Sequence, residues 1–406
     1  MEDYIKNYRK EERKLDVNRW NKGHSLIFLS VSTSFFMWGI ALSIAPLITT
    51  WNFVPSALDY YIIGAAPAGL LVGNLIMGVL SDQLGRKKLF LATVFITSAG
   101  LLGIGISYNA FSLIFLVFIT EFGLGGDETI SLSFLSEYVP LKSRGFALIE
   151  SSNMANIAIT IMAGIFILYG SSLFIQKIAL IIISMTGFII LIISRLKLKE
   201  SIRWELFKKI RENQRFKMDI GFERFISLSL MGIAIIVGFA FTDLVLGPYH
   251  FPKYTGQIIF FTVLAESVTG IAGGFYFARM KRKILAISGF SGMLISWLIV
   301  IAFLSTVLNH LDILILMLVI ASIFGEMAWA SREMLEPENF NTGHRGTGIG
   351  LVRSIGYMLY IFTVFVLAGA SIDIYAFYIL AIFIIGFSGS MLYFKYGRET
   401  FKASIF

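Results

Sequence analysis

Long apolar runs separated by short polar breaks make up most of the chain. A helix needs about 20 apolar residues to cross the hydrocarbon core of a bilayer. Twelve runs predict membrane-spanning helices over residues 25–50, 61–80, 88–107, 111–138, 146–169, 173–194, 224–246, 256–278, 284–307, 311–335, 347–369 and 374–394. The first run is too long for a signal peptide and lacks a small-residue cleavage site, so we expect it to be retained.

One polar break is much longer than the others and divides the helices into six and six. It is rich in charged residues, and its part near Ile202 and Phe207 has an amphipathic pattern that favours a position along the inner lipid surface. We therefore predict an all-α membrane protein with twelve transmembrane helices in two pseudo-symmetric six-helix bundles. The predicted segments are a tail at 1–23, bundles at 24–194 and 224–395, a partly amphipathic linker at 195–223 and a tail at 396–406.

The two halves repeat one another weakly. Gly78 and Gly274 each follow the second helix of a half and lie 196 residues apart. Glu137 and Glu338 each follow the fourth helix and lie 201 residues apart. Parallel repeats of six helices are one known plan for transporters, with the substrate bound between the halves near the midplane.

Composition excludes most soluble classes. Of the residues, 56% are hydrophobic and only 15% are charged, whereas a soluble domain has roughly 25% charged residues. Cysteine is absent, which excludes disulfides and thiolate metal sites. The four histidines lie far apart without metal-ligand spacing, so no metal or other cofactor is expected.

The distribution of basic residues predicts the orientation. Of the 34 lysines and arginines, 30 fall in segments that lie on the same side as the two termini. Because cytoplasmic loops carry the excess of positive charge, both termini are expected in the cytoplasm of a multi-pass cell-membrane protein. The formal net charge of +8 is explained by this orientation, without a nucleic-acid partner.

Several short motifs carry a family resemblance. The stretch Gly78-x3-Asp82-x2-Gly85-Arg86-Lys87-Lys88 resembles the signature of the major facilitator superfamily between helices 2 and 3. Three further stretches agree with it, at residues 123–127, 200–204 and 345–350. Together they resemble the branch of sugar porters, phosphate:proton symporters and metabolite:proton symporters, which implies twelve helices and secondary transport.

The chain departs from the sugar-porter pattern. Val117 stands where that branch often has arginine, Ile202 stands where sugar porters often have proline, and helix 7 lacks their paired glutamines. Phosphate porters pair an aspartate in their fourth membrane helix with one in their seventh. Asp127 in the predicted span 111–138 and Asp243 in the predicted span 224–246 look similar to that pair. The resemblance therefore favours a phosphate or metabolite porter over a sugar porter.

Polar residues within the spans are the candidates for a substrate cavity and a proton site, since ionisable groups in hydrocarbon cost about 2.5–3.5 kcal/mol each. Asp127 is our preferred proton carrier, with Glu121 and Glu128 as alternatives on the same helix and a packing role left open. Arg353 either attracts an anion or pairs with an acid. Arg332 and Glu333 are expected to reach the inner surface and to be structural. The full set for the cavity is Glu121, Asp127, Glu128, Asn153, Asn156, Asp243, Glu266, Glu326 and Arg353.

Charged residues at the inner helix ends resemble the cytoplasmic gate of the family. Their implied role is to hold those ends together while the cavity faces outward; surface solvation is the alternative. For Glu150 an ion pair near Arg144 is favoured. The set is Asp82, Arg86, Glu137, Arg144, Glu150, Arg282, Glu338 and Arg345.

These features predict proton symport of a small hydrophilic, anionic metabolite, with phosphate or a carboxylate as examples. A sugar or other neutral-metabolite porter, an exporter of amphipathic compounds and a non-transporting membrane sensor remain alternatives. The sequence shows no nucleophile–base pair and no nucleotide-binding loop, so an enzyme is not expected. The expected partners are the substrate, protons and membrane lipid, with a monomer as the working unit.

Overall fold

Helices form almost the entire structure. The computed structural model describes residues 16, 19–170, 172–211 and 220–404, and within them twelve helical segments are long and apolar enough to cross a membrane. This confirms an all-α, multi-pass integral membrane protein. The spans are built from α2 (Lys22–Ile48), α3 (Asp59–Leu84), α4 (Arg86–Ile106), α5 (Ala110–Tyr138), α6 (Leu141–Leu168), α7 (Leu173–Lys197), α9 (Phe222–Phe239), α11 (Thr255–Tyr276), α12 (Arg282–Ala302), α14 (Leu311–Asn339), α15 (Arg345–Leu367) and α16 (Ile372–Tyr396).

Short elements complete the chain between the spans. The π-helical turn η2 (Ala240–Leu244) extends α9, and the 3-10 turn η4 (Phe277–Arg279) extends α11. The remaining pieces are α8 (Ile202–Arg211), α10 (Leu246–His250), α13 (Leu304–Asn309), η1 (Ser56–Leu58) and η3 (Pro252–Tyr254). The helix predicted over 284–307 is interrupted, because α12 ends at Ala302 and α13 starts after Phe303.

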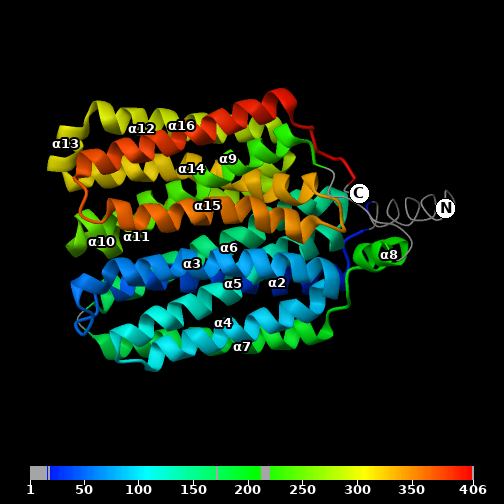
Figure 1. Cartoon of the computed structure of the whole chain (residues 1–406), viewed down its shortest axis with the longest axis horizontal. Coiled ribbons are helices and arrows are strands. Elements are labelled where there is room, and N and C mark those ends of the chain that lie inside the picture. Colours follow the sequence, from blue (N-terminus) through cyan, green and yellow to red (C-terminus); the bar gives the residue numbers. More distant parts are fainter. Residues whose placement is uncertain (1–15, 17–18, 171, 212–219, 405–406) are drawn as a thin grey trace.

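The helices form two bundles that lie side by side (Figure 1). The N-bundle contains α2 to α7, and the C-bundle contains α9 to α16. The bundles meet chiefly where α3 packs along α15 and α6 packs along α11. Small residues allow this approach: a Cβ added to Gly78 of α3 would lie 2.7 Å from the carbonyl oxygen of Gly346 in α15.

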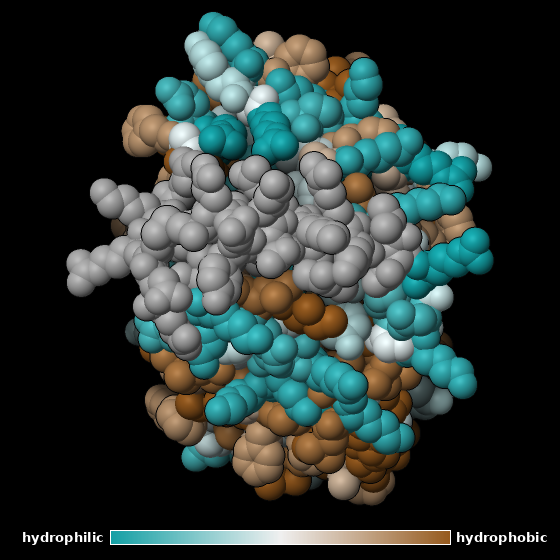
Figure 2. Space-filling view, turned by 90° about the vertical axis from the view of Figure 1, so that its right-hand side faces the viewer, coloured by the Kyte–Doolittle hydropathy of each residue, from teal (hydrophilic) through white to brown (hydrophobic). Residues whose placement is uncertain are grey.

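The start of α2, the end of α16 and α8 lie at one end of the molecule, which we call the terminal end (Figure 1). Hydrophilic side chains gather over this end (Figure 2). Around the flanks, apolar side chains point outward: Phe95, Phe174 and Phe362 are 64%, 67% and 66% exposed. Such a surface is suited to lipid rather than water.

Candidate functional site

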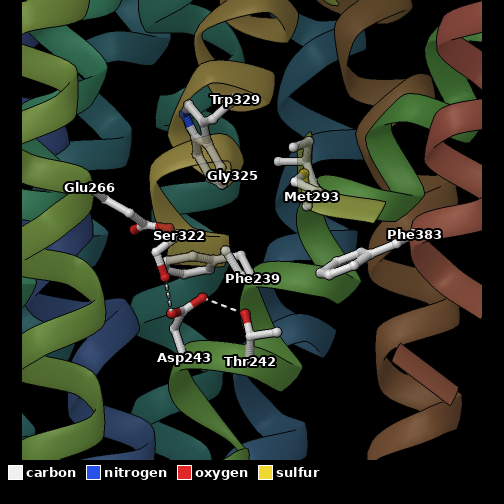
Figure 3. Close-up of a pocket in the computed structure, with 11 residues that line it drawn as sticks. Phe239, Thr242, Asp243, Glu266, Met293, Ser322, Gly325, Trp329 and Phe383 are labelled. Atoms are coloured by element: carbon white, nitrogen blue, oxygen red, sulfur yellow. Dashed lines mark hydrogen bonds between the residues drawn. The ribbon is translucent and has the colours of Figure 1, made fainter. Parts of the chain in front are cut away.

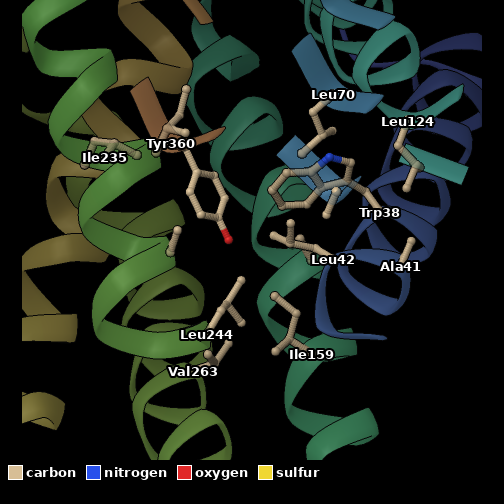
Figure 4. Packing of buried hydrophobic residues seen from close by; sticks show 14 of the residues in the cluster. Trp38, Ala41, Leu42, Leu70, Leu124, Ile159, Ile235, Leu244, Val263 and Tyr360 are labelled. Carbon is tan, nitrogen blue, oxygen red and sulfur yellow. The ribbon is translucent and has the colours of Figure 1, made fainter. Parts of the chain in front are cut away.

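Apolar and aromatic side chains close the centre of the molecule where the bundles meet (Figure 4). Trp38 and Leu42 of α2 face Tyr360 of α15 and Leu244 of η2, and the Trp38 and Trp329 ring centroids lie 5.9 Å apart. The cavity among these residues measures about 10 Å³, close to the space of one water molecule. A larger solute can enter only if the bundles move apart.

A buried group of five charged side chains, here the central charge cluster, joins the bundles. Its members are Glu128 of α5, Arg332, Glu333 and Glu336 of α14, and Arg353 of α15, each no more than 2% exposed. The Arg353 guanidinium lies 2.7 Å from Glu336 and 2.9 Å from Glu333, and it also contacts Glu128. Arg332 lies 3.1 Å from Glu333 and 3.5 Å from Glu336.

The central charge cluster depends on both bundles. Glu128 comes from the N-bundle, while the other four members come from the C-bundle, and the Tyr357 hydroxyl of α15 donates to Glu128 at 3.3 Å. Arg353 is eight residues beyond the start of α15, or about 12 Å along the helix from the terminal end. With every member ionised, three carboxylates face two guanidiniums, so the cluster has one excess negative charge.

Two members of this cluster lie deeper than their sequence positions predict. Arg332 and Glu333 were expected near the surface, yet both are 0% exposed. Because α14 continues to Asn339, these residues lie more deeply than a helix ending at 335 suggests, and Glu128 and Arg353 cover them.

Three carboxylates form a second group, here the acid group, in the C-bundle. Asp243 of η2 accepts hydrogen bonds from Thr242 at 2.6 Å and from Ser322 of α14 at 3.1 Å (Figure 3). Glu266 of α11 points toward the same place, and Asp243 and Glu266 line a cavity of about 20 Å³. Glu326 lies one helical turn beyond Ser322 on α14. No basic side chain among the described residues forms an ion pair with these acids.

Two asparagines of α6 connect the acid group to the N-bundle. The Asn156 amide donates to Glu326 at 2.8 Å and to Asn153 at 3.3 Å, and Asn153 donates to the carbonyl of Ser267 in α11 at 3.0 Å. The amides thus bridge the bundles, as interhelical hydrogen bonds commonly do in membranes.

Asp127 lies on a different face of α5 from Glu128. Its carboxylate accepts from Arg195 of α7 at 2.8 Å and from Thr93 of α4 at 2.7 Å, all within the N-bundle. Arg195 also donates to Ser34 at 2.8 Å and lies over the Phe90 ring at 3.2 Å from its centroid. The carrier role predicted for Asp127 therefore falls on a side chain already held by a buried arginine.

Glu121 is the third acid of α5. It is 0% exposed, packs against Gly69 of α3, and both carboxylate oxygens lack a hydrogen-bond partner among the described residues. A buried carboxylate without a partner is costly when ionised, so this position is suited to a protonated side chain.

At the terminal end, four predicted gate residues come together in what we call the cross-bundle latch: Asp82, Arg86, Glu137 and Arg345. Glu137 lies 3.2 Å from Arg86 within its own bundle and 2.7 Å from Arg345 of the C-bundle. Asp82 pairs with Arg86 at 2.5 Å and accepts from the backbone N–H groups of Gly346 and Thr347 at 3.1 and 2.7 Å. Asp82 thereby caps the first turn of α15 across the interface, where a negative charge is favourable.

The other predicted gate residues divide differently. Arg282 pairs with Glu338 through two contacts of 3.2 and 3.3 Å within the C-bundle. Arg144 pairs with Asp16 at 3.1 Å. The ion pair favoured for Glu150 is not found among the described residues; Glu150 instead packs on Gly274 of α11.

Two carboxylates cap helices in a way that was not predicted from the sequence. Glu200 accepts from the backbone N–H groups of Arg86 and Lys87 at 3.1 Å each, at the start of α4. Glu399 accepts from those of Arg282 and Lys283 at 3.0 and 3.3 Å, at the start of α12. Glu200 and Glu399 lie 199 residues apart, close to the repeat interval, so an extended search of the repeat could have found both.

The described residues contain no group of three or more histidine, aspartate or glutamate side chains arranged to hold a metal ion. The side chains described above can bind protons, form ion pairs and exchange hydrogen bonds.

Comparison with protein families gives a match over most of the chain. The family model described as Major Facilitator Superfamily matches residues 27–363. The putative niacin/nicotinamide transporter NiaP of Bacillus subtilis is 26% identical over 337 residues, which cover 78% of this chain and 80% of NiaP. Inorganic phosphate transporter 1-11 of Oryza sativa subsp. japonica is 34% identical over 119 residues, 28% of this chain, and the match spans only 21% of that transporter.

Solved structures share the fold. The proton:xylose symporter XylE of E. coli superposes with a TM-score of 0.72 at 13% identity, covering 94% of this chain and 97% of XylE. The human organic anion transporter MFSD10 gives 0.68 at 14% identity, covering 93% and 99%. At such identities the likeness concerns the arrangement of helices.

Proposed function

This chain belongs to the major facilitator superfamily, and from that premise we propose that it is a proton-coupled symporter of a small hydrophilic anion, such as phosphate or a carboxylate. It works by alternating access in the cell membrane as a monomer, with both termini in the cytoplasm. The resemblance to phosphate porters, the name of the NiaP relative and the central charge cluster support this proposal.

The central charge cluster carries the proposal. Its two guanidiniums are already held by three carboxylates, so an added anion would meet an excess of negative charge. Protonation of Glu128 removes one negative charge and leaves Arg353 able to pair with an anion. Because each ligand then favours binding of the other, proton and anion move together.

The acid group supplies a second place for protons. Three neighbouring carboxylates without a basic partner cannot all remain ionised in a site that excludes water. Hydrogen bonds from Thr242, Ser322 and Asn156 hold two of these acids in place. We assign this group to proton holding on the C-bundle side of the pathway.

We assign the cross-bundle latch to the switch between the closed and the open terminal end. In the conformation described, Asp82 and Glu137 tie the bundles together at the terminal end. Opening this end requires those bonds to break as the bundles rotate, and the rotation would separate Glu128 from Arg353 at the same time. Exposure to the cytoplasm would therefore coincide with a change in the central charge cluster.

Uptake into proteoliposomes tests this function. Phosphate, monocarboxylates including nicotinate, and neutral controls such as nicotinamide and xylose are each presented with and without an inward proton gradient. Accumulation of an anion that requires the gradient supports the proposal. Uptake of every anion at a rate indifferent to the gradient contradicts proton coupling, and accumulation of only neutral solutes contradicts the anionic substrate.

One alternative has an observation in its favour. The Asn153–Asn156 pair offers amide groups suited to a neutral hydrophilic solute, which keeps a neutral-metabolite porter as the second candidate. An exporter of amphipathic compounds needs a wide apolar cavity, whereas the acids Asp243 and Glu266 line one of the central cavities. A non-transporting sensor would bind a solute without flux in the same vesicles.

A further inference from the structure

A large cavity at the terminal end lies outside the central pathway. It measures about 1160 Å³ and opens between the start of α6 and the end of α11. Four exposed basic side chains line it: Arg19, Lys142, Arg279 and Lys402. None of the four forms an ion pair with another described residue, so their charges are available to a ligand.

The two acids in the wall of this cavity are already neutralised. Asp16 lies 3.1 Å from Arg144 and 2.6 Å from Arg203. Glu338 pairs with Arg282 at 3.2 Å. The four remaining charges are positive, and they give the cavity an excess of positive potential that attracts anions.

The same cavity has an apolar wall that continues onto the flank of the molecule. Phe146 and Phe275 contribute to it, with ring centroids 5.4 Å apart in an edge-to-face arrangement. Phe275 is 53% exposed and its neighbour Tyr276 is 72% exposed, so this part of α11 faces the bilayer. A ligand of this cavity can therefore touch basic side chains at one end and hydrocarbon at the other.

We propose that this cavity binds the headgroup of an anionic phospholipid from the cytoplasmic leaflet. The phosphate pairs with Lys142, Arg279 and Lys402, and the acyl chains leave past Phe275 into the bilayer. Basic pockets between helices on the cytoplasmic side are suited to such headgroups. The assignment rests on the cytoplasmic orientation proposed above but not on the identity of the transported solute.

Lipid retention measures the site directly. The full chain is purified in detergent, mixed with phosphatidylglycerol or phosphatidylcholine, and analysed by native mass spectrometry. Variant K142Q/R279Q/K402Q removes three charges from the cavity. Variant K88Q/K197Q/K199Q is the matched control, since it removes three exposed lysines from the ends of α4 and α7, outside the cavity.

The wild type should retain phosphatidylglycerol in preference to phosphatidylcholine. Each basic side chain beside an anionic headgroup is worth about a fivefold gain in affinity, so the cavity variant should bind phosphatidylglycerol about 100-fold more weakly. The control should bind like the wild type, and all three proteins should elute identically from a sizing column.

Two results would overturn the assignment. Equal loss of phosphatidylglycerol from the cavity variant and the control would show a diffuse surface effect. Displacement of the bound lipid by millimolar glycerol phosphate or inorganic phosphate would show that the cavity takes a soluble phosphate compound. Neither result depends on uptake activity, so the transport proposal is tested separately.

Discussion

Asp127 and Glu128 are adjacent on one helix, and they belong to two different kinds of contact. Asp127 pairs with Arg195 inside the N-bundle, whereas Glu128 contacts Arg353 across the interface. Successive residues of a helix point about 100° apart, which is enough to place one in a bundle core and the other between bundles. Under the proposed alternating access, contacts within a bundle would move as a unit, and contacts between bundles would break.

Mutations of Asp127 and Glu128 should therefore change different properties of the protein. A within-bundle pair should govern folding stability, because nothing in the transport cycle separates its members. A between-bundle contact should govern coupling and conformational balance.

The largest effect is expected from Asp127→Asn. It leaves Arg195 buried without a carboxylate, which costs about 3–5 kcal/mol of unfolding free energy. Thermal unfolding in detergent should show the loss, and Asp127→Asn combined with Arg195→Met should recover much of it. Protein that survives should keep proton-driven uptake; loss of coupling with unchanged stability would reverse the roles assigned to the two acids.

Complete loss of coupling is expected from Glu128→Gln. A gradient of one pH unit supplies about 1.4 kcal/mol per proton, or about tenfold accumulation for each proton moved. The variant should fall to no accumulation while it still exchanges labelled for unlabelled solute across the membrane. Gradient-driven accumulation equal to the wild type would remove Glu128 from the coupling step.

Glu137→Gln tests the cross-bundle latch. It weakens bonds from Arg86, Arg345 and Ser201, and a hydrogen bond to a charged group is worth about 1.5–3 kcal/mol. The free energy needed to open the terminal end should fall by a comparable amount, so the population with an open terminal end should rise.

Spin labels can measure that population, since the chain has no native cysteine. Labels at Lys88→Cys and Lys281→Cys report the separation of the bundles at the terminal end. Glu223→Gln, which changes an exposed acid near the start of α9, is the matched control. Identical distance distributions in Glu137→Gln and Glu223→Gln would contradict the latch.

The smallest effect is expected from Asn156→Ala. It removes the amide bridge to Glu326, and hydrogen bonds between membrane helices average about 0.6 kcal/mol. The same labels should show about a threefold rise in the open population. Asn74→Ala provides the within-bundle counterpart, because Asn74 bonds to Thr129 of the same bundle, and it should leave the distribution unchanged. An equal rise in the open population in Asn156→Ala and Asn74→Ala would contradict the distinction between contacts between bundles and contacts within a bundle.

Much of the fold followed from the sequence because lipid imposes a simple rule. Each membrane span needs a long apolar helix, so the twelve apolar runs of the sequence predicted the twelve spans and their division into two sets of six. The family signature also directed attention to Asp82, Arg86, Glu137 and Arg345, which lie together in the structure.

The partners of the buried charges were much harder to predict. The half of α5 that carries Asp127 and Glu128 is buried on all sides, so apolar periodicity does not reveal which acid faces the interface. Arg195 was assigned to the linker because the apolar run ends before it, yet its side chain extends back to Asp127. Ion pairing between buried side chains depends on how helices distant in sequence pack together, and the local sequence pattern does not predict that packing.

The proposed mechanism requires that proton binding and anion binding be linked at the central charge cluster, and calorimetry can measure this linkage without transport. Titrating the purified protein with its anion in buffers of different ionisation enthalpy gives the number of protons taken up on binding. The wild type should take up protons as the anion binds, and Glu128→Gln, which mimics the protonated side chain, should bind the anion without that uptake. Anion binding by the wild type with no proton uptake, or the same uptake in Glu128→Gln, would contradict the proposed mechanism.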